Sequence, residues 1–289
     1  MKIRELFEGT TEKSIKNSDL FFSGLEVCPP EGPREKWEGE LVLSELALTS
    51  LEGCPKKITK YFSCELNNLT SLEFGPEEVG GDFYCSENQL KSLEFSPRKI
   101  DGFFNCTNNK NLTSLKGMTQ EGVETLNAEG CDLTSLEGSP QKIDGAFYCS
   151  YNKRLKSLKG MTQEGVKRLH CAGCSLSSFE GVARNISGDV FAVKNPMTNL
   201  KGVHKHFDTI GGKMLLSDSI ESNILGLLKI KNLKRVSFFK NSVDLGEKSV
   251  AKKEISDIIN KYLPNPTLAE IIDCQNELVE AGFEDYAEL

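Results

Sequence analysis

The sequence predicts a mainly-β repeat solenoid of about eleven units, each 21 or 22 residues long, stacked through a parallel sheet. Three observations predict this fold. Asn or Cys recurs three residues beyond the second apolar position in seven consecutive units, and residues 104–146 and 147–189 correspond at an offset of 43, including an identical LKGMTQEGV. The third observation is an apolar-x-apolar pair that returns mostly every 21 or 22 residues: Leu20/Phe22, Leu41/Leu43, Phe62/Cys64, Phe83/Cys85, Phe104/Cys106, Leu126/Ala128, Phe147/Cys149, Leu169/Cys171, Val190/Ala192, Met214/Leu216 and Val236/Phe238.

The first expected element is an N-terminal cap over residues 1–19, because a stacked array exposes its first strand unless something covers it. The solenoid follows over residues 20–245. In the unit from Val79 to Lys99, apolar positions alternate as in a strand and then continue through Leu90 and Leu93. Gly and Pro recur on the returning arms, which predicts irregular or extended arms instead of helices.

Two polar columns accompany each predicted turn of the solenoid. We expect the amides of the first column to bond backbone groups where the chain leaves the sheet, and a cysteine thiol to replace an amide weakly. The serines of the second column are expected to do the same at the next turn. The first column is Asn67, Asn88, Asn109, Cys131, Asn152, Cys174 and Asn195, and the second is Ser50, Ser71, Ser92, Ser114, Ser135, Ser157 and Ser178.

The last expected element is a helical C-terminal cap over residues 246–289. One helix is predicted over 247–262, and a second begins at Thr267, which forms a capping box with Glu270. The second helix is expected to turn its apolar stripe to the core. The alternative is that the stripe is exposed and binds a partner. The stripe is Leu268, Ile271, Ile272, Leu278 and Val279.

The ten cysteines suggest a disulfide scaffold or a zinc site at first sight. Seven of them occupy repeat positions, however, and buried reduced thiols behave as small hydrophobic groups. The sharpest metal-like motif is His170-Cys171-x-x-Cys174. Strand alternation turns His170 away from the two thiols, so we expect no metal site there and no cofactor.

Charge and length restrict the partners of the chain. It has 289 residues and a net charge of −7, which gives little support for binding nucleic acid phosphates or an acidic membrane surface. No apolar run reaches the roughly 18 residues of a membrane span, and MKIRELFEGTTEK lacks the apolar core of a secretory signal. We therefore expect a cytoplasmic protein.

The repeats resemble those of the leucine-rich-repeat superfamily, through F-x-C-S-x-N-x-L at Phe83–Leu90 and L-H-C-A-G-C-S-L at Leu169–Leu176. Their length is similar to the short repeats of bacterial leucine-rich-repeat effectors, although Phe and Cys replace the strand leucines. A closer resemblance, over roughly residues 40–289, is to leucine-rich-repeat proteins of tailed bacteriophages. It rests on L-T-S-L-E-G-x-P, G-x-F-x-C-S-x-N and the tail CQNELVEAGFEDYAEL. This resemblance implies the fold and a phage setting in the host cytoplasm.

No sequence motif points to an enzyme. The chain has no P-loop, no G-x-S-x-G elbow and no H-E-x-x-H, and its carboxylates recur on the arms as a solvated stripe. A regular column of carboxylates does not supply the unequal environments that a paired acid and base need. We therefore expect a non-enzymatic protein.

The predicted functional residues lie on the outward side of the sheet, between and just before the apolar pairs. Exposed aromatic residues with Arg are typical of interface hot spots, although strand propensity alone also favours Tyr and Phe. The predicted partner-binding residues are Tyr61, Asp82, Tyr84, Phe103, Asn105, Asn127, Tyr148, Arg168, His170 and Phe191.

The main functional hypothesis is a protein-binding scaffold whose partner is a protein, with a phage product acting on a host or defence factor as its setting. One alternative is a structural or virion-associated protein that assembles through the solenoid ends. Another is binding of a small molecule or carbohydrate across the aromatic face.

Overall fold

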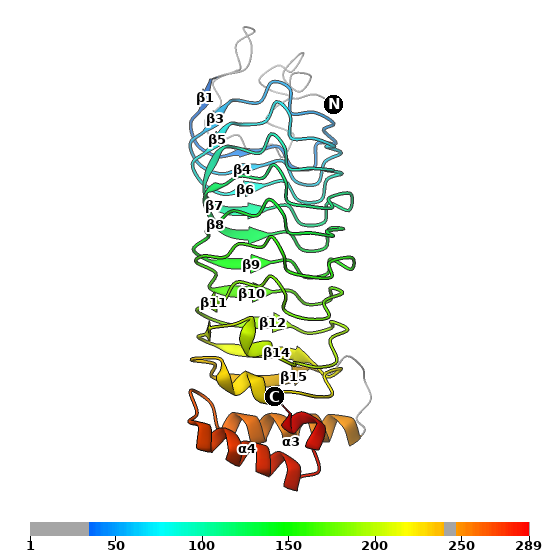
Figure 1. Ribbon diagram of the computed structural model, residues 1–289. Coiled ribbons are helices and arrows are strands. Elements are labelled where there is room, and N and C mark those ends of the chain that lie inside the picture. Colours follow the sequence, from blue (N-terminus) through cyan, green and yellow to red (C-terminus); the bar gives the residue numbers. More distant parts are fainter. Residues whose placement is uncertain (1–34, 240–246, 289) are drawn as a thin grey trace. The chain divides into compact units, whose positions relative to one another are not determined.

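The computed structural model describes residues 35–239 and 247–288 (Figure 1), which form parts of two compact units, Met1–Ile143 and Asp144–Leu289. Each unit is a parallel-sheet solenoid, and the chain makes about nine turns at a spacing of about 22 residues. This confirms the predicted fold class. The predicted cap over residues 1–19 and the first apolar pair, Leu20/Phe22, lie outside the described residues.

Unit 1 contains two parallel ladders, because each turn contributes a short strand on its arm and another at its apolar pair. The main ladder pairs Leu41 with Phe62, Phe62 with Phe83, Phe83 with Phe104 and Phe104 with Leu126, so the predicted register is correct. The arm ladder was not predicted. The strands are β1 (Lys36–Trp37), β2 (Leu41–Val42), β3 (Lys57–Ile58), β4 (Phe62–Ser63), β5 (Glu78–Val79), β6 (Phe83–Tyr84), β7 (Lys99–Asn105) and β8 (Glu121–Asn127).

Unit 2 repeats this construction from Phe147 onward, with parallel pairs from β9 to β15 that keep the predicted register. Two arms depart from the expected extended form, because η1 (Val203–Lys205) and η2 (Leu225–Lys229) are 3-10 helices. The strands are β9 (Ala146–Tyr148), β10 (Arg168–His170), β11 (Asn185–Ile186), β12 (Val190–Ala192), β13 (Thr209–Ile210), β14 (Lys213–Ser217) and β15 (Arg235–Phe239).

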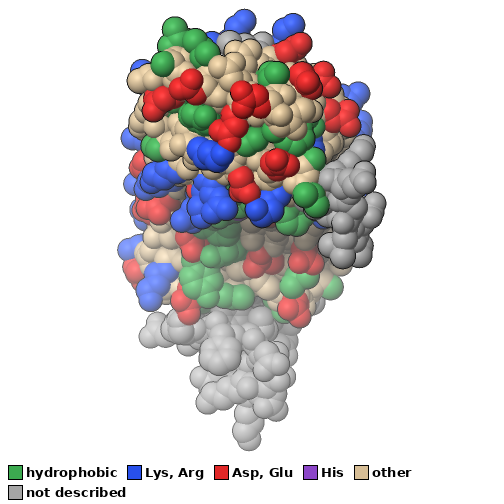
Figure 2. Space-filling model, turned by 90° about the horizontal axis from the view of Figure 1, so that it is seen from below, with side chains coloured by type: hydrophobic (Ala, Val, Ile, Leu, Met, Phe, Trp, Pro, Cys, Tyr) green, Lys and Arg blue, Asp and Glu red, His purple; other side chains and the backbone are tan. Residues whose placement is uncertain are grey.

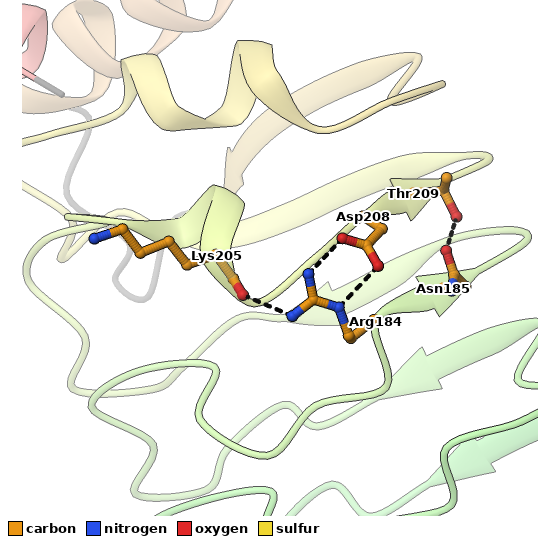
Figure 3. Close-up of polar contacts among 5 residues, drawn as sticks. All are labelled: Arg184, Asn185, Lys205, Asp208 and Thr209. Atoms are coloured by element: carbon orange, nitrogen blue, oxygen red, sulfur yellow. Dashed lines mark hydrogen bonds and ion pairs between the residues drawn. The ribbon is translucent and has the colours of Figure 1, made fainter.

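An exposed ion pair joins the arms of two turns in unit 2, beside the β11–β13 ladder (Figure 3). The guanidinium of Arg184 binds both oxygens of Asp208, with Nε at 2.8 Å from Oδ2, and also donates to the carbonyl of Lys205. Thr209 Oγ1 donates to Asn185 Oδ1 at 2.8 Å. The hydrogen bond from Arg184 lowers the pKa of Asp208.

The interior of each turn is filled by the predicted apolar positions. Phe62, Phe83 and Phe104 are fully buried and stack from turn to turn with ring centroids 5.9 and 5.2 Å apart. The thiols of Cys64 and Cys85 are buried beside them and donate to strand carbonyls. All nine described cysteines are free thiols, which agrees with their interpretation as packing residues.

The Asn column forms the predicted ladder of buried amides. Asn109 Nδ2 donates to the carbonyls of Cys85 and Cys106, and its Oδ1 accepts from the N–H of Leu90 at 3.0 Å. The thiols of Cys131 and Cys174 take the place of the amide and donate at 3.3 Å to the carbonyls of Cys106 and Cys149, with longer contacts to a second carbonyl each. Serines of the second column accept a backbone N–H two residues ahead, as in Ser71 and Glu73.

The identical segments Leu115–Val123 and Leu158–Val166 share the contacts of their glutamines in their respective units, although Thr119 donates to the carbonyl of Pro97 and Thr162 makes no such bond among the described residues. Gln120 Nε2 donates to the carbonyls of Met118 and Gly138, and Gln163 Nε2 donates to those of Met161 and Gly181. Each glutamine therefore ties its own arm to the arm of the next turn.

Helix α3 (Glu247–Lys261) covers the last strand of unit 2, and α4 (Leu268–Glu280) packs beside it (Figure 1), followed by the 3-10 helix η3 (Glu284–Ala287). Asn260 Oδ1 accepts from the N–H of Val236 at 2.8 Å, and its Nδ2 donates to the carbonyl of Val236 at 2.9 Å. The amide thus satisfies both backbone groups of an edge residue. Buried Lys252 donates to the carbonyl of Ile220 and the hydroxyl of Tyr286.

The predicted apolar stripe of α4 is only partly buried. The capping box of Thr267 and Glu270 is present, and Ile271 and Leu278 face the core. The expectation was wrong for Leu268, Ile272 and Val279, which are exposed because the contacts of α4 with α3, η2 and η3 leave these positions uncovered. Figure 2 views this end of the chain, where exposed apolar side chains are interspersed with those of Asp and Glu.

Candidate interaction surface

Three columns of side chains lie on the outward side of the main ladder in unit 1, because strand alternation turns the residues before, between and after each apolar pair away from the core. We call these positions the unit 1 sheet face. Most are half-buried, whereas Ser63 and Ser86 are buried by their neighbours on this face. The face consists of Glu40, Tyr61, Asp82, Phe103 and Thr125; Val42, Ser63, Tyr84, Asn105 and Asn127; and Ser44, Glu65, Ser86, Thr107 and Glu129.

Three predicted residues form an aromatic ladder on the unit 1 sheet face. The Tyr61 and Tyr84 rings meet edge to face with centroids 6.2 Å apart, and Tyr84 meets Phe103 in the same way at 5.7 Å. All three side chains are half-buried. Rings held against one another in this way keep part of their surface accessible and need little ordering when a partner binds.

Asp82 holds this ladder in place. One of its carboxylate oxygens accepts from the Tyr84 hydroxyl at 2.8 Å, and the other accepts from the Phe103 N–H at 2.8 Å. Asp189 in unit 2 accepts from the Lys213 N–H in the same manner. Both oxygens of Asp82 therefore accept hydrogen bonds within the fold. Its contact with a protein partner stays a prediction.

Glu65 is a residue of this face that the sequence reasoning missed. Its carboxylate accepts from Ser63 Oγ at 3.3 Å and also from Ser86 Oγ and Asn105 Nδ2, so it lies beside the predicted Asn105. The signal was present in the sequence, because Glu65 follows the second apolar position and must point outward. The prediction considered only the residues before and between the apolar pair.

The two predicted asparagines end their strands on this face. Asn105 Oδ1 accepts from the Thr107 N–H, and Asn127 Oδ1 accepts from the Glu129 N–H, both at 3.1 Å. The two residues pair directly across β7 and β8. Their amide nitrogens lie on the same face as the aromatic ladder.

Carboxylates and burial set the protonation of the aromatic hydroxyls. Burial, the hydrogen bond to Asp82 and the charges of Asp82 and Glu65 raise the pKa of Tyr84 to about 12. Burial and the charge of Glu40 raise the pKa of Tyr61. Both tyrosines remain neutral hydrogen-bonding groups at physiological pH.

Unit 2 carries the other predicted residues, in a second aromatic ladder. The imidazole of His170 lies between Tyr148 at 4.6 Å and Phe191 at 4.2 Å, measured between ring centroids. Arg168 precedes this ladder on β10 and is exposed. The predicted residues thus fall into two groups, one in each unit.

The metal-like motif is divided between the two sides of β10 and the turn after it. Cys171 and Cys174 are buried, whereas His170 belongs to the outward ladder. Among the described residues, no three His, Cys, Asp or Glu side chains are placed to hold a metal ion. No described helix is long and apolar enough to cross a membrane.

No protein-family model, curated protein or solved structure matches this chain.

Proposed function

We propose that this chain is a non-enzymatic protein-binding scaffold that holds its partner on the outward sheet faces. The observation that carries the proposal is the pair of half-buried aromatic ladders, Tyr61–Tyr84–Phe103 and Tyr148–His170–Phe191. Aromatic side chains that stay partly accessible on a rigid sheet are the residues that dominate binding energy at protein interfaces.

A role as scaffold fits the chemistry of the unit 1 sheet face better than catalysis does. The carboxylate of Asp82 accepts hydrogen bonds from the Tyr84 hydroxyl and from the Phe103 N–H on the next turn, which commits it to holding the face. A general acid or base needs instead a carboxyl group that is free to exchange a proton with a substrate.

The setting that we propose is a phage product that acts on a host or defence protein in the host cytoplasm. The resemblance of the repeat motifs to those of tailed-phage proteins supports this setting.

A pull-down from bacterial lysate with the tagged full-length chain tests the proposal. Tyr84→Ser and Tyr148→Ser should each reduce the amount of captured partner at least several-fold. Tyr84→Ser removes the central ring of the unit 1 ladder, and Tyr148→Ser removes the first ring of the unit 2 ladder. Tyr151→Ser is the matched control, since Tyr151 is 55% exposed but lies on a turn outside both ladders. A partner that survives both ladder substitutions, or is lost with Tyr151→Ser alone, would refute the proposal.

A further inference from the structure

The unit 1 sheet face has an unbalanced charge. Among its three columns over five turns, four positions are acidic and none is Lys or Arg. The acidic residues are Glu40, Asp82, Glu65 and Glu129. Asp82 has a structural role, so the remaining three glutamates carry the argument.

The fold itself does not require these glutamates. Unit 2 builds the same columns with Arg168, Lys213 and Arg235, and its only acidic residue there is Asp189, the structural counterpart of Asp82. The two units therefore present opposite charges from the same backbone positions. The acidic character of the unit 1 sheet face is thus a property of its surface chemistry.

The acidic and aromatic groups of unit 1 lie together. Glu65 contacts Asn105, whose neighbour on the previous turn is Tyr84, and Tyr84 is the central ring of the ladder. Asp82 supports the same ring through its hydroxyl. Aromatic faces attract cations through their quadrupole, and nearby carboxylates add to that attraction.

We infer that the unit 1 sheet face receives a cationic segment of the protein partner, with Lys or Arg side chains lying over Tyr61, Tyr84 and Phe103 and close to Glu65. The inference rests on the proposed function and specifies the chemistry of its partner. Guanidinium groups suit this site best, because they stack on aromatic rings and bind carboxylates in the same plane.

A second copy of the chain fits this face less well than a basic partner. Two unit 1 sheet faces would oppose like charges, and the net charge of −7 makes the copies repel each other. The remaining mode of self-association places the basic face of unit 2 of another copy on the unit 1 sheet face. The experiment distinguishes this mode from binding of a basic partner.

The experiment titrates the full-length, isotope-labelled chain with a short peptide in which arginine and serine alternate, and follows amide shifts by NMR. Saturable shifts are expected at Tyr84, Phe103 and Asn105 and should weaken as salt is added. The same peptide with citrulline for arginine keeps the shape without the charge and should not bind. Equal binding of the citrulline peptide, or shifts confined to other turns, would overturn the inference.

Matched variants assign the interaction to the ring and to the carboxylate. Tyr84→Leu should weaken peptide binding about two- to five-fold because it removes the ring, whereas Tyr84→Phe keeps the ring, loses only the hydroxyl bond to Asp82 and should bind more tightly than Tyr84→Leu. Glu65→Gln should also weaken binding, while Glu87→Gln, an exposed change on a turn, should not. Thermal unfolding of each variant verifies that the fold is intact.

The outcomes also separate this inference from the proposed function. If partner capture depends on Tyr84 but Glu65→Lys leaves both peptide binding and partner capture unchanged, the inference fails and the scaffold proposal stands. If the peptide binds as expected and no ladder substitution affects a captured protein, the scaffold proposal fails. A change in oligomeric state with Glu65→Lys, measured by light scattering, would identify a second copy as the occupant and overturn the inference.

Discussion

The amide of Asn109 shows how much a single side chain contributes to a turn. It is fully buried and joins three backbone groups, the carbonyls of Cys85 and Cys106 and the N–H of Leu90. Such groups cost roughly 1 to 3 kcal/mol each when they are buried without a partner. The amide therefore accounts for much of the polar stabilisation of its turn.

We predict that Asn109→Ala lowers the free energy of unfolding by about 3 kcal/mol or more, because all three backbone groups lose their partner. Asn109→Cys should cost less, since Cys131 and Cys174 show that a thiol at this position donates to a strand carbonyl. Urea unfolding of the two variants measures the difference. Equal losses for Ala and Cys would contradict the role assigned to the thiol.

Single residues also show where sequence reasoning succeeds and fails. The column of Asn and Cys was predictable because its spacing from the strand pair is the same in seven consecutive turns. Glu65 was missed because the prediction did not include the residue after the apolar pair, although strand alternation turns it outward. Its contacts with Ser86 and Asn105 on the next two turns could not be predicted, because the sequence does not show which side chains meet across turns. Strand alternation places Ser63 on the outward face, but Ser44 and Glu65 bury it there, and alternation alone does not show such covering.

Among the elements, the last strand depends on its helix. A strand at the end of a sheet exposes unpaired N–H and C=O groups that invite association with another chain. Helix α3 covers β15, and Asn260 pairs with both backbone groups of Val236. This arrangement explains why a helix follows the solenoid at this end.

We predict that Asn260→Ala destabilises unit 2 by about 1 to 3 kcal/mol, because the two backbone groups of Val236 lose their partner. Hydrogen exchange at the Val236 amide should become faster. Asn265→Ala is the control, since Asn265 bonds the exposed N–H of Asn232, which water can replace. Unchanged exchange at Val236 would show that Asn260 does not protect the strand.

Helix α4 shows the limit of periodicity as a guide to packing. Its five apolar residues cover more of the helix surface than α3, η2 and η3 bury, so Leu268, Ile272 and Val279 remain exposed. The sequence identified the helix and its capping box correctly. It did not show how many sides of the helix are covered, because that depends on tertiary packing.

At the level of the whole molecule, buried thiols make stability depend on pH. Burial raises the pKa values of Cys64, Cys85 and Cys171 above those of free thiols. The native state therefore keeps these protons at a pH where the unfolded chain has lost them. Stability is complete below the unfolded pKa near 9 and falls as the pH rises above it.

We predict that raising the pH from 7.5 to 10 lowers the free energy of unfolding by about 1 kcal/mol for each such thiol. Denaturant unfolding at a series of pH values measures the decline. Cys64→Ala, Cys85→Ala and Cys171→Ala combined should make it shallower, because Ala128 and Ala192 already occupy the same position in other turns. A decline as steep as that of the parent chain would exclude the thiols as its cause.

The fold of the whole chain was more predictable than its surface. One turn is specified by local spacing, and every turn repeats that specification, so the register from Leu41 to Phe104 followed from the apolar pairs alone. The arm ladder of β1, β3 and β5 was not predictable in this way, because its two-residue strands carry no alternation of their own.

The paired contacts of Gln120 and Gln163 have a consequence for how such a chain changes in length. Each glutamine bonds only its own arm and the next one, so a copied block of 43 residues contains both the donor and the acceptors of these hydrogen bonds. Adding or removing a whole block therefore preserves these glutamine contacts. Recombination between the identical segments can lengthen or shorten the outward surface in steps of two turns.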